Sequence, residues 1–198
     1  MNTLSLVLSP ALPQDVAPDV ETELIPRLMA SDPRAMGEAY DAHHAAVRAF
    51  AARLVGEASA AEDLVHEVFL SLPRAIRSFR YESSLRTFLI SIAVNHARHH
   101  VRAATRRRSA HDRMEREPTR AVSDPEALTR RKQLASALTR ALDTLPLDQR
   151  VAFVLCEVEE RSSREVAAIV DVPEGTVRTR LHHAKQKLRA MLAKEGQL

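Results

Sequence analysis

The sequence has 198 residues, of which 45% are hydrophobic and 28% are charged, proportions typical of a folded protein in water. Four glycines, no tryptophan and only 4% aromatic residues exclude collagen-like and glycine-rich chains and favour helices over a strand-rich barrel. The net charge is +3, but residues 76–120 hold 11 basic and 4 acidic side chains, and residues 172–198 hold 6 and 2. Two cationic blocks of this kind indicate a polyanionic partner such as nucleic acid, with two solvated helix faces as the alternative.

Cysteine usage and hydropathy favour a cytoplasmic location. Cys156 is the single cysteine, so no internal disulfide can form and no cysteine pair is available for a zinc site. We expect it to act as a small hydrophobe, with a redox role as the minor alternative. No uncharged apolar run approaches the roughly 18 residues of a membrane span. The first basic residue is Arg27, so we expect no signal peptide.

The first predicted helix follows an N-terminal tail. Residues 1–25 are rich in proline and acidic, and we expect them to be disordered. Asp32-Pro33 is a helix start signal and Gly56 is a stop signal. Between them, apolar residues recur at steps of three and four: Met36, Tyr40, Val47, Phe50 and Leu54.

Two more helices are predicted before residue 104. Ser59 and Glu62 have the spacing of a capping box, in which each side chain satisfies a backbone N–H at the helix start. We expect Pro73 to kink or end this helix and residues 78–84 to form a polar turn. A third helix starts at Leu85, with one apolar side and one cationic side. The polar side chains on it are Arg86, Asn95, Arg98, His99 and Arg102.

A basic linker is predicted next. Residues 104–124 contain almost no large apolar side chains and cannot bury enough surface to offset the entropy of ordering. Asp124-Pro125 restarts a helix that continues to Pro146. We then expect Asp148 to cap a short buried helix, VAFVLCEV. The fold class is therefore all-α, as two small helical domains joined by a flexible basic linker.

The C-terminal segment has the pattern of a helix-turn-helix. Ser162 and Glu165 form a second capping box ahead of a helix of about eight residues, which ends near Asp171. A longer helix after Pro173 carries several cations. In this motif the N-terminal part of the second helix enters the major groove, where Arg178 can donate two hydrogen bonds to one guanine. A solvated helix hairpin is the alternative interpretation.

Two separate stretches resemble bacterial RNA polymerase sigma factors of the extracytoplasmic-function type. The promoter-reading helix-turn-helix of that family is similar to the stretch from Ser162, SSREVAAIVDVPEGTVRTRLHHAKQKLRAML. The segment that precedes this motif in the family is similar to DTLPLDQRVAFVLCEVEERS. AEDLVHEVFL and SFRYESSLRTFLISIAVNHARHHVR resemble its polymerase-binding and minus-10-reading segments. The resemblance divides the chain into residues 26–103 (region 2), the linker 104–124, and residues 125–198 (region 4).

The resemblance implies a role for three groups of residues. The helix that docks on the polymerase clamp helices would contribute Asp63, Leu64, Glu67 and Val68, although core packing is an equal alternative for the two apolar residues. An extruded minus-10 base and the single strand around it would be held by Arg80, Ser83, Ser84, Arg86, Asn95, Arg98 and Arg102. The minus-35 duplex would be read by Arg178, Thr179, His182, His183 and Lys185.

The implied partners are core RNA polymerase, through its largest-subunit clamp helices and its flap, promoter DNA, and an anti-sigma factor. We expect no cofactor, no small-molecule substrate and no enzymatic activity, because the sequence has no glycine-rich phosphate loop, GxSxG or HExxH. His96, His99 and His100 have a spacing that could hold a metal, but cationic surface histidines are the favoured interpretation. An ordinary helix-turn-helix regulator that acts without polymerase is the alternative function.

Overall fold

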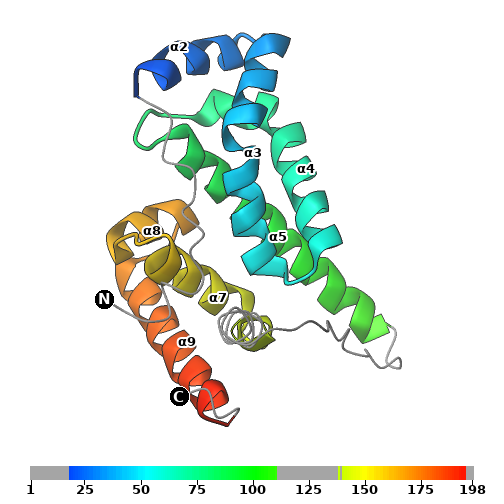
Figure 1. Ribbon diagram of the computed structural model, residues 1–198, viewed down its shortest axis with the longest axis vertical. Coiled ribbons are helices and arrows are strands. Elements are labelled where there is room, and N and C mark those ends of the chain that lie inside the picture. The colour runs from blue at the N-terminus through cyan, green and yellow to red at the C-terminus, as the bar shows by residue number, and fades with distance from the viewer. Residues whose placement is uncertain (1–17, 111–137, 139, 195–198) are drawn as a thin grey trace, which may run out of the picture.

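The computed structural model describes residues 18–110, 138 and 140–194, and all that follows concerns this part of the chain (Figure 1). It is helical throughout, without a strand in these residues, which confirms the all-α expectation. Side chains are described for residues 21–100, 138 and 140–193.

Three long helices form the N-terminal half: α3 (Pro33–Val55), α4 (Ala58–Ala75) and α5 (Leu85–Ala110), with a 3₁₀ turn at Ile76–Ser78 (Figure 1). The predicted signals set the ends of α3. The Asp32 side chain accepts a hydrogen bond of 2.9 Å from the Arg34 backbone N–H, and Gly56 ends the helix in the left-handed region at φ 72°. Only glycine adopts that conformation without strain, so the helix stops there.

The capping box predicted at the start of α4 is wrong. The helix begins at Ala58 with Glu57 in the N-cap position, so Ser59 lies inside its first turn. The Ser59 hydroxyl donates to Glu57 at 2.9 Å, and the Glu62 carboxylate pairs with Arg48 of α3 instead. Pro73 does not end α4, which continues for two residues beyond it.

Part of the predicted disordered tail is a helix. α2 spans Pro18–Met29 and buries Leu24, Ile25 and Leu28, which are 3%, 3% and 0% exposed. Burial of these apolar side chains offsets the entropy of ordering the segment. Arg27 ties α2 to the start of α3 through ion pairs of 2.9 Å with Asp32 and 2.8 Å with Glu38. Residues 1–17 lie outside the described residues.

The linker expected from residue 104 also begins too early. α5 stays helical to Ala110, so residues 104–110 extend the helix. The rest of the predicted linker and the helix restart at Asp124-Pro125 lie outside the described residues.

The C-terminal half consists of α7 (Leu147–Phe153), a π-helical turn η2 (Val154–Val158), α8 (Ser163–Val170) and α9 (Glu174–Lys194). The Ser162–Glu165 capping box is confirmed: Glu165 accepts from the Ser162 backbone N–H at 2.8 Å, and the Ser162 hydroxyl accepts from the Glu165 N–H at 3.3 Å. Asp148 is not a cap, because Pro146 occupies that position and Asp148 lies in the first turn.

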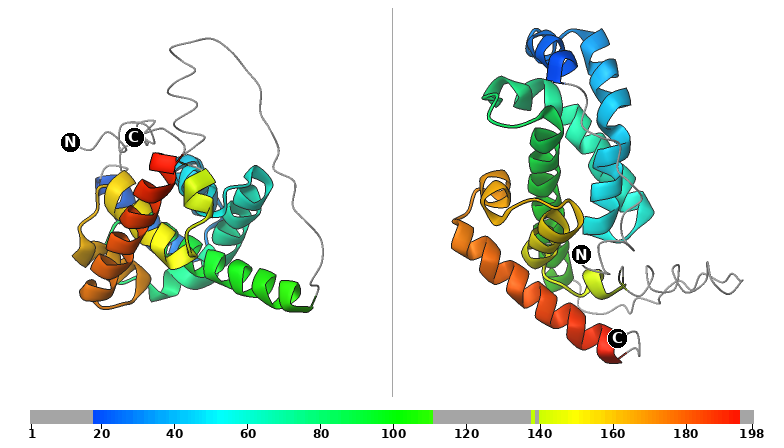
Figure 2. Two further views of the ribbon diagram at one scale, coloured as in Figure 1. Left: turned by 90° about the horizontal axis from the view of Figure 1, so that it is seen from below. Right: turned by 60° about the vertical axis from the view of Figure 1, so that its left-hand side comes forward.

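The two halves lie against each other, with α5 between α3 and α4 on one side and α7 and α8 on the other (Figure 2). Their buried apolar side chains form one continuous cluster. Arg150 of α7 is 8% exposed and donates a hydrogen bond to the backbone carbonyl of Leu54, at the end of α3. The halves are therefore packed together rather than held only by a linker.

Candidate nucleic-acid interface

α9 presents a polar face whose first turns are open to solvent. Its opposite face is buried, with Val177, Ala184, Leu188 and Leu192 each at most 1% exposed. The expected minus-35 readers Arg178, Thr179, His182 and His183 are all exposed on the outer side. This division follows from the helical period, since residues four apart lie on one face.

Two hydrogen bonds hold the first outward side chains of α9. The Arg178 side chain is 70% exposed and pairs with Glu174 one turn earlier at 2.6 Å, while the Thr179 hydroxyl donates to the Gly175 carbonyl at 2.9 Å. Lys185 differs from the others, because it is 34% exposed and pairs with Glu157 of η2 at 2.7 Å. The structure therefore brings four of the five expected readers together on an open surface and turns the fifth toward its own domain.

The turn between α8 and α9 fixes the relative orientation of the two helices. Asp171 ends α8 in the left-handed region at φ 53°, which aspartate tolerates better than most residues. At the other end of α8, hydrogen bonds from Ser162 to Glu165 lower the pKa of that carboxyl group. A charged Glu165 in the first turn also complements the helix dipole.

The expected minus-10 residues begin at an exposed loop and continue along α5. Arg80 and Ser83 are exposed, and the Ser84 hydroxyl accepts from the Thr87 N–H at 3.2 Å, as a helix-capping group does. A cavity of about 470 Å³ lies here, lined by Ser83 and Ser84 together with Phe88 on one side and by Arg161 and Glu165 on the other. The loop and α8 of the other half thus share one cavity.

Further along α5, two of the expected phosphate-binding arginines face the C-terminal half. Arg86 is 9% exposed and pairs with Glu159 at 2.8 Å, and Arg98 pairs with Asp148 at 3.2 Å. Asn95 is exposed. Arg102 lies in α5 beyond the last residue whose side chain is described. The expected minus-10 set is therefore divided between an open loop and a covered helix face.

Glu159 lies between two arginines of the N-terminal half. Its side chain is 3% exposed, Arg53 lies 3.4 Å away, and both arginine side chains are 10% exposed. Burial, followed by the neighbouring charge of Arg86, lowers the pKa of Arg53, while Glu159 opposes that shift. The carboxylate neutralises two cations in a place that water hardly reaches.

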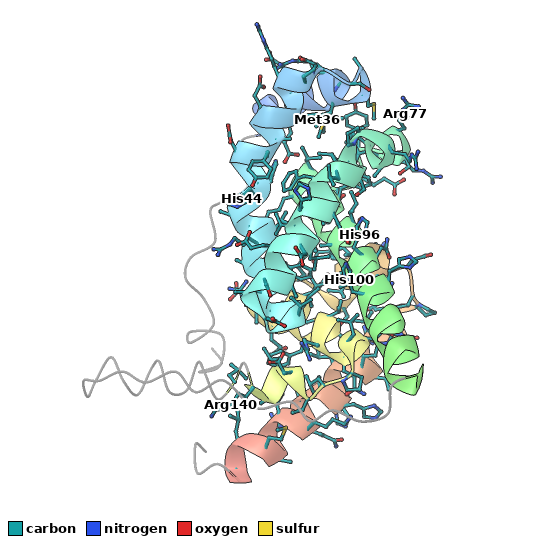
Figure 3. All side chains as sticks on the ribbon, turned by 90° about the vertical axis from the view of Figure 1, so that its right-hand side faces the viewer. Met36, His44, Arg77, His96, His100 and Arg140 are labelled. Carbon is teal, nitrogen blue, oxygen red and sulfur yellow. The ribbon has the colours of Figure 1, made fainter. Side chains whose placement is uncertain are left out.

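The expected polymerase-docking residues of α4 separate into core and surface. Leu64 and Val68 are 1% and 0% exposed, so these two side chains belong to the core and present nothing to a partner. Asp63 is exposed, and Glu67 is half-buried beside two histidines of α5. Figure 3 labels these histidines, His96 and His100, on α5. Glu67 lies 3.3 Å from His96 and 2.7 Å from His100, and the apolar Leu70 nearby is 67% exposed.

Two of the three histidines with metal-like spacing have an acidic neighbour in the fold. No carboxylate accompanies them at matching spacing in the sequence, but Glu67 reaches both His96 and His100 from the neighbouring helix. Within the residues that the structure describes, no group of three or more potential ligands is arranged to hold a metal ion. None of the described helices is long and apolar enough to cross a membrane.

Four residues at the contact between the halves were missed in the sequence: Arg53, Asp148, Glu159 and Arg161. The sequence pattern predicts a helix cap at Asp148, and the other three belong to ordinary charged stretches. The charge distribution along the sequence could have indicated the two acidic residues, Asp148 and Glu159. Residues 121–171 carry 9 acidic and 7 basic side chains and lie between the two cationic blocks, so they can pair with either block.

Comparison with known protein families gives two matches in chain order. The family described as sigma-70 region 2 matches residues 39–107, and the family described as sigma-70 region 4 matches residues 135–188.

Individual relatives extend these matches. The ECF RNA polymerase sigma-E factor of Escherichia coli is 37% identical over 134 residues, which cover 64% of this chain and 70% of that protein. The RNA polymerase sigma-H factor of Pseudomonas aeruginosa is 30% identical over 176 residues, which cover 85% of this chain and 91% of that protein.

Solved structures show the same fold. The sigma factor RpoE of Bartonella quintana, in complex with the anti-sigma factor NepR, aligns with a TM-score of 0.59 and 26% identity over 89% of this chain and 98% of that one. CnrH in complex with the cytosolic domain of CnrY aligns with a TM-score of 0.60 at 21% identity, over 89% and 99% of the two chains.

Proposed function

This chain belongs to the extracytoplasmic-function RNA polymerase sigma factors, and from that premise we propose how its residues divide the work of promoter recognition. A sigma factor binds core RNA polymerase and directs it to specific promoters. The two family matches in their order along one chain carry this conclusion.

We assign minus-35 recognition to the outer face of α9. Arg178, Thr179, His182 and His183 are exposed there, and arginine at the start of a recognition helix can donate two hydrogen bonds to guanine in the major groove. Lys185 contributes charge from one side of this face, where Glu157 holds it. The cations further along α9 would position the helix on the phosphate backbone.

We assign minus-10 recognition to the loop before α5 and the first half of that helix. Ser83 and Ser84 line a cavity that also contains the Phe88 ring, so hydroxyl groups and an aromatic surface are available to an extruded base. Arg80 and Asn95 are exposed nearby in the chain. Arg86, Arg98 and Arg102 would hold the backbone of the melted strand.

We assign polymerase docking to the exposed side of α4. Asp63, Glu67 and Leu70 combine two acids with an unusually exposed apolar side chain, which suits a contact with the clamp helices. Region 4 would contact the flap. The core residues Leu64 and Val68 support this surface from behind.

The remaining proposals concern other partners and location. The relative RpoE was solved with an anti-sigma factor, which supports the proposal that such a factor also holds this chain. The reaction chemistry belongs to the polymerase, so we assign this chain no enzymatic activity, cofactor or small-molecule substrate. It acts where the polymerase acts, in the cytoplasm. We retain residues 26–103 and 125–198 as the functional regions, with α2 added to the first.

Transcription in vitro tests the function directly. Purified core polymerase would transcribe whole genomic DNA with and without the full chain, and the new transcripts would be sequenced. We expect new start sites that share two upstream elements. If the folded protein gives none while another sigma factor activates the same core, the chain is instead a regulator that binds DNA without polymerase, and direct selection of bound DNA would show that.

A further inference from the structure

The segment that joins α4 to α5, residues 76–84, is open to solvent along most of its length. From Arg77 to Ser83 every residue except Phe79 is exposed. Phe79 is 7% exposed and anchors the segment, since its ring contacts the rings of Tyr81 and Phe88 at centroid distances of 5.2 and 5.1 Å. Phe88 in turn lines the cavity that the proposed function assigns to an extruded minus-10 base. A role of this segment in DNA binding therefore rests on the proposed function.

Tyr81 leaves most of its ring in water. It is 59% exposed, and its ring meets that of Phe79 in an edge-to-face contact. The second tyrosine of the chain, Tyr40, is 43% exposed, but its ring contacts both His44 and Phe69. The Tyr81 ring is therefore an open aromatic surface of the kind on which nucleic-acid bases stack.

The backbone of Tyr81 lies in the left-handed region, at φ 58°. Among the non-glycine residues with positive φ in the described part of the chain, it is the one aromatic residue; the others are Ser31, Glu160 and Asp171. A bulky side chain is unfavourable in this region, whereas glycine adopts it without strain. Residues held in such conformations cluster at binding sites. A tyrosine at a position that suits glycine indicates that the ring itself has a use.

Two cations accompany the Tyr81 ring. Arg77 and Arg80 are exposed, and neither forms an ion pair with a residue that the structure describes. Figure 3 shows Arg77 at the outer edge of the N-terminal half. Arg86 of α5, by contrast, pairs with Glu159 at 2.8 Å. The two guanidinium groups before α5 can therefore bind phosphates without first breaking an ion pair.

We propose that Tyr81 is a second base-binding residue of the minus-10 site, on which the base next to the extruded one stacks. The cavity lined by Ser83 and Ser84 receives the extruded base, and the Tyr81 ring, two residues before Ser83, receives its neighbour. Arg77 and Arg80 bind the phosphates of the same strand. Because every base has an aromatic face, this stacking raises the affinity for melted DNA without selecting one base at that position.

The test uses holoenzyme assembled from core polymerase and the full chain. Its probe is a single-stranded minus-10 oligonucleotide from a promoter found by genomic transcription, with 2-aminopurine placed at each position in turn. Beside the extruded base, we expect quenched fluorescence with the wild type and Tyr81→Phe, and brighter fluorescence with Tyr81→Ala. Tyr40→Ala is the matched control, because it removes the other exposed tyrosine and should behave as the wild type. Equal fluorescence at every position with the wild type and Tyr81→Ala would overturn the proposal.

Two substitutions of Tyr81 separate stacking from a role in folding. Tyr81→Gly and Tyr81→Ala both remove the ring, but only glycine relieves the backbone at φ 58°. We expect Tyr81→Gly to melt at a higher temperature than Tyr81→Ala, while both bind the oligonucleotide about tenfold more weakly than the wild type. An affinity that follows the melting temperature would make Tyr81 a structural residue and overturn the proposal.

The two arginines are tested through the salt dependence of binding. Each phosphate contact to single-stranded DNA contributes about 0.7 to the slope of log affinity against log salt concentration. Replacement of both Arg77 and Arg80 by alanine should therefore lower the slope by roughly 1.4. Arg34→Ala removes an exposed cation at the start of α3 and should leave the slope unchanged. An unchanged slope in the double variant would overturn the assignment of the phosphates to these arginines.

Two further results decide what the ring binds. Tyr81→Ala with wild-type affinity for core polymerase supports stacking on DNA, whereas a loss of that affinity places the ring against the polymerase and overturns the proposal. Genomic transcription separates the proposal from the function on which it rests. New starts from the wild type, with Tyr81→Ala unchanged in affinity and fluorescence, reject the stacking role alone. A wild-type chain that gives no new starts rejects the sigma function and the stacking role with it.

Discussion

Arg178 combines high exposure with a position in the first turns of the recognition helix. Its side chain is 70% exposed, and it forms an ion pair with Glu174 in the same helix. Such a pair in water contributes little to stability, so it holds the guanidinium group without preventing a contact with DNA. At this scale, exposure and position indicate which side chains are available to a base.

Arg178→Ala should weaken binding of the holoenzyme to its promoter by about 1–3 kcal/mol and relax the preference at one base pair. Binding to a library of promoters that vary in the minus-35 element would measure both effects. Arg189→Ala is the control, since it removes an exposed cation three turns further along α9. A uniform loss across all sequences would make Arg178 a phosphate contact instead.

Cys156 is half-buried, and burial raises the pKa of its thiol. The thiolate is the reactive form, so the native protein at neutral pH should react slowly with a disulfide reagent and quickly once it is unfolded. Absorbance of the released thiol, followed with and without denaturant, measures the difference. Equal reaction rates in the folded and unfolded states would favour the alternative, a redox role for Cys156.

At the scale of elements, local hydrogen bonds decide where a helix begins. Ser162 and Glu165 satisfy each other's backbone N–H groups at the start of α8, whereas Ser59 lies inside α4 and caps nothing. The two serines were indistinguishable in sequence, because both precede an acid by three residues. The turn before a helix decides which residue becomes its N-cap. Gly56 ends α3 and Glu57 follows it directly, so Glu57 and not Ser59 is the N-cap of α4.

Ser162→Ala should lower the free energy of unfolding by about 1 kcal/mol, while Ser59→Ala should leave it nearly unchanged. Urea unfolding of the two variants gives both values. A similar loss in both would contradict the assignment of the caps.

The same cap predicts a dependence on pH. Hydrogen bonds from Ser162 lower the pKa of Glu165 from its ordinary value of 4.5, so the folded state holds this carboxylate charged more strongly than the unfolded state. Its stabilising contribution is complete above pH 4.5 and is lost as the pH falls through the lower folded value. Glu165→Gln should therefore destabilise the protein at pH 7 and converge with the wild type in acid, as thermal unfolding across pH would show.

Asn95 lies on the exposed side of α5, where its amide can donate to and accept from a base edge. Asn95→Ala should leave duplex binding intact and reduce the formation of open complexes, and a pre-melted template should restore activity. Footprinting with permanganate measures the opened bases. Wild-type activity on both duplex and pre-melted promoters would remove Asn95 from the melting site.

At the scale of the whole molecule, most helices other than α2 were predictable, and their mutual packing was not. Periodicity and caps located α3, α5, α8 and α9 because both signals are local. Glu159 and Arg86 are 73 residues apart, and Asp148 and Arg98 are 50 apart, so no spacing pattern announces these pairs. The resemblance predicted the minus-10 residues of α5. Only the folded structure shows that two of them, Arg86 and Arg98, face the C-terminal half.

Arg150 tests how strongly the halves depend on each other. It donates to the carbonyls of Leu54 and Leu145 and pairs with Asp143 at 2.9 Å. Arg150→Ala leaves buried carbonyls without a donor and should cost about 1–3 kcal/mol of stability, measured by calorimetry. Arg164→Ala, which removes an exposed arginine of α8, should cost little. Equal losses of stability in the two variants would mean that the contact between Arg150 and the Leu54 carbonyl does not stabilise the protein.

The packing of α2 has a practical consequence for fragments. Glu21 accepts a hydrogen bond of 3.1 Å from the backbone N–H of Leu85, the first residue of α5, and Leu24 and Ile25 are buried beside it. A region 2 fragment started at residue 26, the boundary expected from the sequence, loses this cap and exposes the apolar surface that α2 covers. A fragment that carries region 2 should therefore begin at Pro18 or earlier.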